Sequence, residues 1–270
     1  MPFTTLALFA LLLAPSQAGK LELTNIRATY GLFGPARQEF RILPGDVLHV
    51  QFDINDLTPD QAGRLQFAAK LAVTKLATDT AKEETYEENL GEAPPVVSVL
   101  GGNKVPHAVN VTTGIKQAPG LYRLKVTVTD LQSKKEGSFM RDFTVEKLDF
   151  GLVRLQLSYD RLGQLPAPGV GAVGQTLYLN AVAVGYKPDP KDQQTALTFE
   201  MTVLDDADKP VLAKPLTGEV KGMAVDTHVP FRFELPLHRA GRFKVVVKAT
   251  DQVAKKTATL TVPLLAAEQK

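Results

Sequence analysis

The chain has 270 residues, of which 44% are hydrophobic and 22% are charged, as is typical of folded globular proteins. Its 31 Lys and Arg residues nearly balance its 29 Asp and Glu residues, which gives no support to nucleic-acid binding through a clustered basic surface. No cysteine occurs, so disulfide bonds, thiolate metal sites and a lipid anchor attached to Cys are excluded.

The first eighteen residues are typical of an export signal. Leu6 to Ala14 form an unbroken apolar run, too short to span a bilayer but of the length of a signal-peptide core. Ser16-Gln17-Ala18 places small residues at the two positions that a signal peptidase reads. We therefore predict cleavage after Ala18 and a secreted, periplasmic or cell-surface protein. Met1 to Thr5 contain no Lys or Arg, which departs from the usual pattern of such signals. A buried first strand is the alternative interpretation, although nothing in the apolar run alternates.

Alternation of apolar and polar residues dominates the chain that follows. In the first half it is clearest in Leu48 to Ile54, Leu65 to Val73 and Tyr122 to Val128, and each run is bounded by Gly, Pro or Asp. This pattern predicts half-buried strands. The segment from Asp79 to Glu92 departs from it and is interpreted as a helix or a loop, and its Glu-rich part from Glu83 to Glu92 as a solvated edge or loop. No later segment reaches the eighteen apolar residues of a transmembrane helix.

Two acidic clusters are candidates for calcium binding. Asp53-Ile54-Asn55-Asp56 resembles the calcium-linker motif of cadherins, although it falls within a domain and the other acidic cadherin motifs are not found. Calcium requires about six to eight oxygens that converge on one point. For the second cluster, a hairpin turn over Asp206 to Lys209 is the simpler interpretation, since Asp favours turns. The candidate ligands are Asp53, Asn55, Asp56, Asp205, Asp206 and Asp208.

An internal repeat predicts two domains. Pro119 to Asp130 match Ala240 to Asp251 at an offset of 121 positions, and Gly45 to Val50 match Gly174 to Leu179 at an offset of 129. The change of offset indicates loop insertions, which surface connections tolerate. We predict a signal peptide over residues 1–18, a first domain over 19–147 and a second over 148–270, with a short, stiff connection near residues 147–150.

The repeated block resembles the last two strands of immunoglobulin-like and fibronectin type III-like sandwiches. An aromatic residue, Tyr122 or Phe243, follows Gly and precedes apolar alternation that ends in Asp, as at the E–F corner of such domains. The resemblance implies an all-β fold of two tandem antiparallel Ig-like β-sandwich domains. It also implies that the Tyr122 hydroxyl bonds back to the corner loop, which Phe243 cannot do. The superfold carries no function with it.

The second half contains three glycines, at Gly169, Gly171 and Gly174, in the spacing of a dinucleotide-binding loop. That chemistry needs a helix directly after the glycines, so that its N-terminus can face the pyrophosphate. An alternating strand follows instead from Gln175, so we interpret the segment as a loop and expect no cofactor.

Catalytic and metal-binding signatures are weak. None of the four histidines pairs with another at the short spacing of a zinc site, so we expect surface or strand-edge positions for them. No serine lies in a Gly-x-Ser-x-Gly elbow, and no spacing singles out a carboxylate pair. We therefore expect the chain not to be an enzyme. The histidines are His49, His107, His228 and His238.

Basic residues recur at the outward positions of the repeated strands and in the turns that follow them. Such a face can attract an anionic polymer or surface. The simpler interpretation is a solvated sheet face that charge protects from aggregation. The candidate residues of this binding face are Arg123, Lys125, Arg242, Lys244, Lys248, Lys255 and Lys256.

These features predict an exported, non-catalytic structural or interaction protein that presents two Ig-like domains to a protein or an anionic surface polymer. One alternative is a carbohydrate-binding module, which requires aromatic side chains such as Tyr86, Tyr159 and Tyr186 on one flat face. A second is a pair of accessory domains of a larger extracellular assembly. The third is a hydrolase, which requires a cleft that collects His, Asp and Ser side chains.

Overall fold

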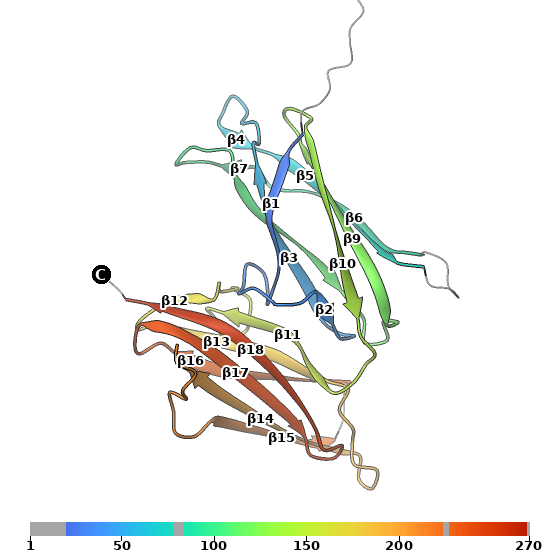
Figure 1. Cartoon of the computed structure of the whole chain (residues 1–270), viewed down its shortest axis with the longest axis vertical. Helices are drawn as coiled ribbons and strands as arrows, with labels where there is room; N and C mark the ends of the chain where they lie inside the picture. Colours follow the sequence, from blue (N-terminus) through green and yellow to red (C-terminus); the bar gives the residue numbers. More distant parts are fainter. Residues whose placement is uncertain (1–19, 78–83, 224–226, 269–270) are drawn as a thin grey trace, which may run out of the picture.

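The computed structural model describes residues 20–77, 84–223 and 227–268 (Figure 1). The predicted signal peptide, residues 1–18, lies outside the described residues. Within the described ranges every regular element is a strand, and no helix offers the length and hydrophobicity needed to cross a membrane. The strands form two sandwiches in succession, so the prediction of an all-β fold with tandem sandwiches is confirmed.

In the first sandwich a three-stranded sheet lies against a five-stranded sheet. The small sheet has the order β1-β3-β8, the large sheet has the order β2-β10-β9-β5-β6, and β4 pairs with β7 in a separate ribbon. The strands are β1 (Glu22–Thr29), β2 (Arg41–Ile42), β3 (Val47–Asn55), β4 (Arg64–Leu65), β5 (Phe67–Lys75), β6 (Glu84–Glu92), β7 (Val96–Val97), β8 (Val105–Thr112), β9 (Gly120–Asp130) and β10 (Glu136–Val145).

The second sandwich repeats this arrangement. Its small sheet has the order β11-β13-β16 and its large sheet has the order β12-β18-β17-β14-β15. In Figure 1 its strands are inclined obliquely to those of the first sandwich. The strands are β11 (Gly151–Ser158), β12 (Val170–Ala172), β13 (Thr176–Val184), β14 (Gln194–Leu204), β15 (Leu216–Met223), β16 (His228–Pro236), β17 (Gly241–Asp251) and β18 (Lys256–Ala267).

The glycine-rich segment was expected to be a loop. It differs from that expectation because it contains the edge strand β12. Val170 pairs with Leu265 of β18 in parallel, and the backbone N–H of Leu265 donates to the carbonyl of Gly169 at 2.8 Å. The strand β13 follows, so these glycines do not open a helix as a dinucleotide site requires. The first domain has the equivalent short parallel strand, β2 beside β10.

The acidic segment is a strand rather than a helix or a loop. Over the residues that the structure describes, β6 pairs antiparallel with β5 from Ala68↔Glu92 onward and forms an edge of the large sheet. Residues 78–83 lie outside the described residues. The segment lacks clear apolar alternation because the side chains of an edge strand meet solvent, and Lys70 forms an ion pair with Glu88 there. The expectation of a solvated edge was therefore correct.

Alternation correctly predicts the core strands. Leu48, Val50, Phe52 and Ile54 are fully buried in β3, and the buried apolar residues form one cluster between Leu21 and Val145 and another between residues 150 and 266. Burial of such side chains is the main source of stability in sandwiches that have no disulfide bonds.

The tyrosine corner of the first domain is confirmed. The Tyr122 hydroxyl donates to the carbonyl of Ala118 at 2.8 Å and accepts from Gln117 Nε2 at 2.7 Å. Tyr122 is 1% exposed, so these bonds satisfy a polar group that is shielded from water.

The repeat extends to a pair of fully buried aspartates, Asp130 and Asp251. Each carboxylate accepts at least one backbone N–H group of the turn that follows it and one from a distant loop, Thr58 or Lys187. Burial by itself would raise the pKa of Asp130, but the bonds from Ser133 and these N–H groups outweigh it and keep the pKa below its usual value. Each aspartate thus ties a turn to the body of its domain.

Replacing Tyr122 by Phe should destabilise the first domain by about 1–2 kcal/mol, because the carbonyl of Ala118 and the amide of Gln117 lose a buried partner. Urea unfolding measures this change. Tyr159→Phe, at a side chain that is 44% exposed, is the control and should shift the free energy of unfolding by less than about 0.5 kcal/mol. Equal effects of the two substitutions would contradict the role of the corner bond.

Candidate functional site: the junction and groove between the domains

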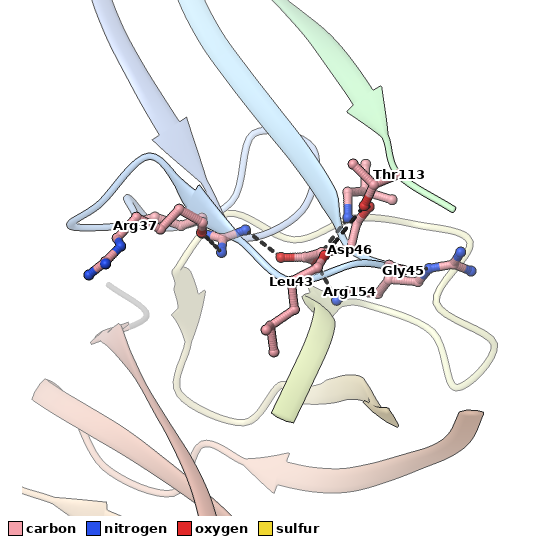
Figure 2. Close-up of polar contacts among 8 residues, drawn as sticks. Arg37, Leu43, Gly45, Asp46, Thr113 and Arg154 are labelled. Carbon is pink, nitrogen blue, oxygen red and sulfur yellow. Dashed lines mark hydrogen bonds and ion pairs between the residues drawn. The ribbon is translucent and has the colours of Figure 1, made fainter. Parts of the chain in front are cut away.

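Asp46 lies buried where the two domains meet. Its Oδ2 accepts from Arg37 Nη1 at 3.0 Å within the first domain, and its Oδ1 accepts from the backbone N–H of Arg154, in β11 of the second domain, at 2.7 Å (Figure 2). The side chains of Arg37 and Asp46 are only 11% and 5% exposed, so their ion pair is shielded from water. The carboxylate of Asp46 therefore binds the guanidinium of Arg37 in its own domain and the backbone N–H of Arg154 in the other domain at the same time.

The backbone around Asp46 is held by further bonds. The N–H and the hydroxyl of Thr113 both donate to the carbonyl of Asp46 at 3.0 Å, and Arg154 Nε donates to the carbonyl of Gly45 at 2.8 Å. Gly45 has φ +91°, a left-handed conformation that glycine adopts without strain. These bonds fix the backbone of Asp46 so that both of its carboxylate oxygens point toward their partners.

A bulge in β11 makes the Arg154 N–H available. Arg154 has φ +52°, and the register of β11 against β13 shifts between Val153 and Gln156. A residue at a bulge is left unpaired in the sheet ladder. The first domain has the same bulge at Asn25, with φ +53°, 129 positions earlier. The bulge therefore belongs to the repeated fold, and the second domain uses it to contact the first.

The segment between β1 and β2 packs closely on the second domain. Tyr30 lies against the second core, and the Arg37 guanidinium stands 5.1 Å from the centre of its ring. A Cβ atom on Gly31 would lie 2.8 Å from Cγ of Gln156, so only glycine permits this approach. These contacts and the Asp46 bonds restrict movement of one sandwich against the other.

A groove lies beside this junction, in two adjoining hollows of about 560 and 770 Å³. Its floor is the outward face of β17 and β18, where Lys244 pairs with Pro263 and Val246 with Thr261. Its wall is the segment of the first domain from Phe33 to Arg41. Because the junction holds that segment in place, it also sets the width of the groove.

The groove carries both signs of charge together with apolar surface. Lys244 Nζ is paired with Asp208 at 2.7 Å, whereas Arg27 and Arg242 have no carboxylate at ion-pair distance among the described residues. Phe33 and Val170, at the same groove, are 38% and 43% exposed. Free cations beside exposed apolar side chains are features of a surface that binds another molecule.

The groove brings together residues that the sequence placed in two separate predictions. Asp205, Asp206 and Asp208, candidates for calcium, line it with Arg242 and Lys244 from the candidate basic face. The aspartates form the expected turn, since Asp205 Oδ1 accepts from the N–H groups of Ala207 and Lys209. Within the described ranges no three His, Cys, Asp or Glu side chains gather in the manner of a metal site.

The other calcium candidates lie elsewhere in the first domain, at the end of β3. Each has a partner of its own: Asp53 pairs with Lys104 at 2.7 Å, Asn55 donates to Thr24 Oγ1 at 3.0 Å, and Asp56 accepts from Asn103 at 3.3 Å. These side chains are engaged in separate contacts rather than turned toward one point.

The remaining basic candidates do not line the groove. Arg123 and Lys125 lie on β9, and Arg123 is bound by both carboxylate oxygens of Asp142 at 2.6 and 2.8 Å. Lys248 pairs with Glu200 at 3.5 Å, Lys256 pairs with Asp149, and Lys255 occupies the turn before β18 with φ +55°. Carboxylates are thus interspersed along this basic face.

The expectation of surface or strand-edge histidines was wrong for His49, whereas His107 lies in the edge strand β8 as expected. His49 lies in the central strand β3, faces a hollow of about 310 Å³ at the junction, and has a buried Nδ1 with no hydrogen bond. Burial lowers its pKa, with Asp46 opposing and Arg37 reinforcing the shift. His107 packs its ring 5.6 Å from that of Phe52 and 4.9 Å from that of Phe67, and burial lowers its pKa too.

Sequence reasoning missed Arg37, Asp46 and Arg154 as the residues of the junction. A signal was available in the repeat, because Gly45-Asp46 matches Gly174-Gln175. Gln175 Oε1 accepts from the N–H of Ala172 inside its own domain, whereas Asp46 reaches across to the other domain. A difference between matched positions of two repeats is therefore a place to look for an interdomain contact.

No family model and no curated protein sequence matches this chain. Among solved structures it is similar to red sea bream transglutaminase, with 10% identity and a TM-score of 0.30 over 94% of this chain and 32% of that chain. It is also similar to the C-terminal domain of the Streptococcus agalactiae AgI/II polypeptide BspA, with 8% identity and a TM-score of 0.29 over 89% and 99%. The chain spans about a third of the length of the transglutaminase. Likeness at this level has no bearing on what the groove binds.

Replacing Asp46 by Ala should loosen the junction, because Arg37 is left as a buried charge without its partner and the Arg154 N–H loses its acceptor. We expect a loss of about 3–5 kcal/mol and two separate unfolding transitions in calorimetry. Gln175→Ala at the matched position is the control and should cost about 1 kcal/mol. A single transition at the wild-type temperature in Asp46→Ala would disprove the role of this carboxylate.

Stability should fall on acidification below neutrality. Because burial holds the pKa of His49 and His107 below the unfolded value of about 6.5, the unfolded chain binds more protons there, and the free energy of unfolding decreases as the pH falls through about 6.5. Urea unfolding between about pH 7.5 and pH 5 measures this loss. His49→Gln should reduce it, whereas His238→Gln, at an exposed position, should not. An unchanged loss in His49→Gln would contradict the assignment.

Proposed function

We propose that the chain is an exported, non-catalytic interaction protein that presents the groove between its two domains to a protein partner. The observation that carries the proposal is the groove itself, where Arg27 and Arg242, which have no ion-pair partner in the described part of the chain, lie beside exposed Phe33 and Val170 on a junction held by Asp46. A pre-ordered surface loses less conformational entropy on binding than a flexible one.

The mixture of charges favours a protein over an anionic polymer as the partner. Asp205, Asp206 and Asp208 stand among the cations of the groove and would repel a uniform polyanion. Outside the groove, Asp142 pairs with Arg123 and Glu200 pairs with Lys248. Carboxylates therefore neutralise much of the basic strand face. An anionic surface polymer is the second candidate, supported by the two arginines that lack a carboxylate partner among the described residues.

The other functions receive less support. Tyr159 and Tyr186 follow β11 and β13, which run antiparallel, so they stand at opposite ends of that sheet, and Tyr186 packs partly into the core. A flat platform for sugar stacking needs such rings side by side. Of the described residues that line the groove, none is Ser, His or Cys, so it offers no hydrolase-like nucleophile and base.

Affinity capture from the native cell envelope with the mature protein tests the proposal. We expect the wild type to recover one protein in stoichiometric amount, and Arg242→Glu combined with Phe33→Ala to lose it, because both changes fall in the groove. Lys125→Glu, an exposed change on β9 outside the groove, is the matched control and should retain the partner.

Equal recovery by all three proteins would place binding elsewhere on the chain. Recovery of polysaccharide alone would favour the anionic polymer and contradict the protein partner. Turnover of a substrate by the purified chain would overturn the non-catalytic assignment.

A further inference from the structure

The two domains differ at the corner that precedes their matched strands β9 and β17. Val47 pairs with Thr112 and Thr176 pairs with Pro236, so β8 and β16 end at equivalent positions. Residues 113–119 then lead to β9, whereas only residues 237–240 lead to β17. The corner of the second domain is therefore three residues shorter.

The longer corner closes the end of the first sandwich. It supplies Gln117 and Ala118, which bond to the hydroxyl of Tyr122, and the ring of Tyr122 stacks on that of Phe143 at 5.5 Å between centres. Both rings are almost completely buried. Two aromatic rings and an ordered loop thus fill this end of the core.

The same end of the second sandwich is filled less completely. Phe243 stands at the position of Tyr122 and Leu264 at that of Phe143, each 121 positions later. The second domain therefore has one aromatic ring instead of two, no hydroxyl and a shorter loop. A cavity of about 460 Å³ opens there between the two sheets. Its inner wall consists of Met201, Val203, Leu235, Leu237, Phe243 and Leu264.

The mouth of the cavity is apolar as well. Val211, Leu212 and Leu216 form its lip and are 40%, 49% and 45% exposed. Exposed aliphatic side chains that continue into an apolar cavity are typical of a binding site for an apolar ligand. The volume falls in the lower part of the range of about 300–1,000 Å³ that small-molecule pockets occupy.

The rim supplies a cation. The guanidinium of Arg239 lies 5.3 Å from the centre of the Phe243 ring, at the boundary between the apolar wall and solvent. The other charge that lines the cavity, Glu234, is paired with Arg161 at 3.5 Å. Oδ1 of Asp205 is occupied by the backbone N–H groups of Lys209 and Ala207, and these bonds, with a smaller contribution from the charge of Arg239, lower the pKa of Asp205. Arg239 is thus placed to form an ion pair with an anionic group of a ligand at the mouth of the cavity.

We propose that this cavity binds a free fatty acid, with the aliphatic chain among the wall residues and the carboxylate at Arg239. The apolar side chains of the wall form no hydrogen bonds. The aliphatic chain of the fatty acid therefore contributes to affinity through burial of its surface. The carboxylate contributes through the ion pair and orients the chain with its head at the mouth. This binding is separate from the proposed partner of the groove.

Titration calorimetry of the full chain with dodecanoate, below the concentration at which it forms micelles, tests the proposal. We expect saturable binding of one molecule per chain. Leu264→Phe gives the second domain the residue of the first at this position and should abolish binding by filling the cavity. A wild-type unfolding temperature in this variant would show that the fold is kept, and Leu264→Met, which conserves volume, should still bind.

The head group is tested separately. Arg239→Gln should weaken dodecanoate by about tenfold, or about 1.4 kcal/mol, and change the affinity for uncharged dodecanol by less than about threefold. Arg242→Gln, on β17 directly after the loop that holds Arg239 but facing the groove, is the matched control and should bind dodecanoate as the wild type does.

Several outcomes would overturn the proposal: no saturable binding of dodecanoate, equal binding by Leu264→Phe, or an equal loss for dodecanol and dodecanoate in Arg239→Gln. Binding of anionic phospholipid vesicles without binding of dodecanoate would indicate a membrane surface instead. Dimers that Leu212→Asp dissociates, in a chain that binds no dodecanoate, would indicate that a second copy covers the cavity.

Discussion

The burial of the Asp46 carboxylate is the constraint on which the arrangement of the two domains depends. A carboxylate removed from water must find a counter-charge and hydrogen-bond donors. Arg37 supplies the charge from the same domain, and the backbone of Arg154 supplies a donor from the other. Separating the domains would leave this charge only partly satisfied. The segment that carries Arg37 therefore stays against the second domain, and the groove beside it keeps its walls.

The two sandwiches share one plan, and the features of interest arise where matched positions differ. Asp46 reaches across the junction, while Gln175 bonds within its own domain. The bulge at Arg154 offers an N–H to the first domain, while the matched bulge at Asn25 holds a side chain that bonds to Asp53. Tyr122 closes one sandwich end, while Phe243 leaves an opening at the other. A repeated scaffold thus tolerates different chemistry at its corners and turns, because its strands supply the core.

The groove and the cavity are neighbours that share residues. Phe243 and Leu264 line both, whereas Arg242 belongs to the groove and Arg239 to the cavity. Arg242 and Phe243 are successive residues of β17 and point to opposite faces of the sheet, whereas Arg239 lies in the loop before that strand. The outward face of β17 forms the floor of the groove, and its inward face reaches the core where the cavity opens. A substitution at Phe243 or Leu264 alters the groove and the cavity at once. Substitutions of Arg242 and Arg239 each alter only one of these sites, so they distinguish the role of the groove from that of the cavity.

The sequence alone determined the class of fold and its duplication. The alternation of Leu48 to Ile54 shows which face of a strand is buried, and the Gly-x-aromatic pattern at Tyr122 specifies a corner bond five residues or fewer away along the chain. These are local relations. The edge strand β12 was read as a loop, and β6 was recognised only as a solvated edge among other readings, because an edge needs neither alternation nor apolar residues to pair. Only the tertiary structure brought Asp46 to Arg154, 108 positions later, and set Arg242 and Asp206 in one groove. Period-two patterning records burial within a sheet, and it contains no information on which surfaces of two domains meet.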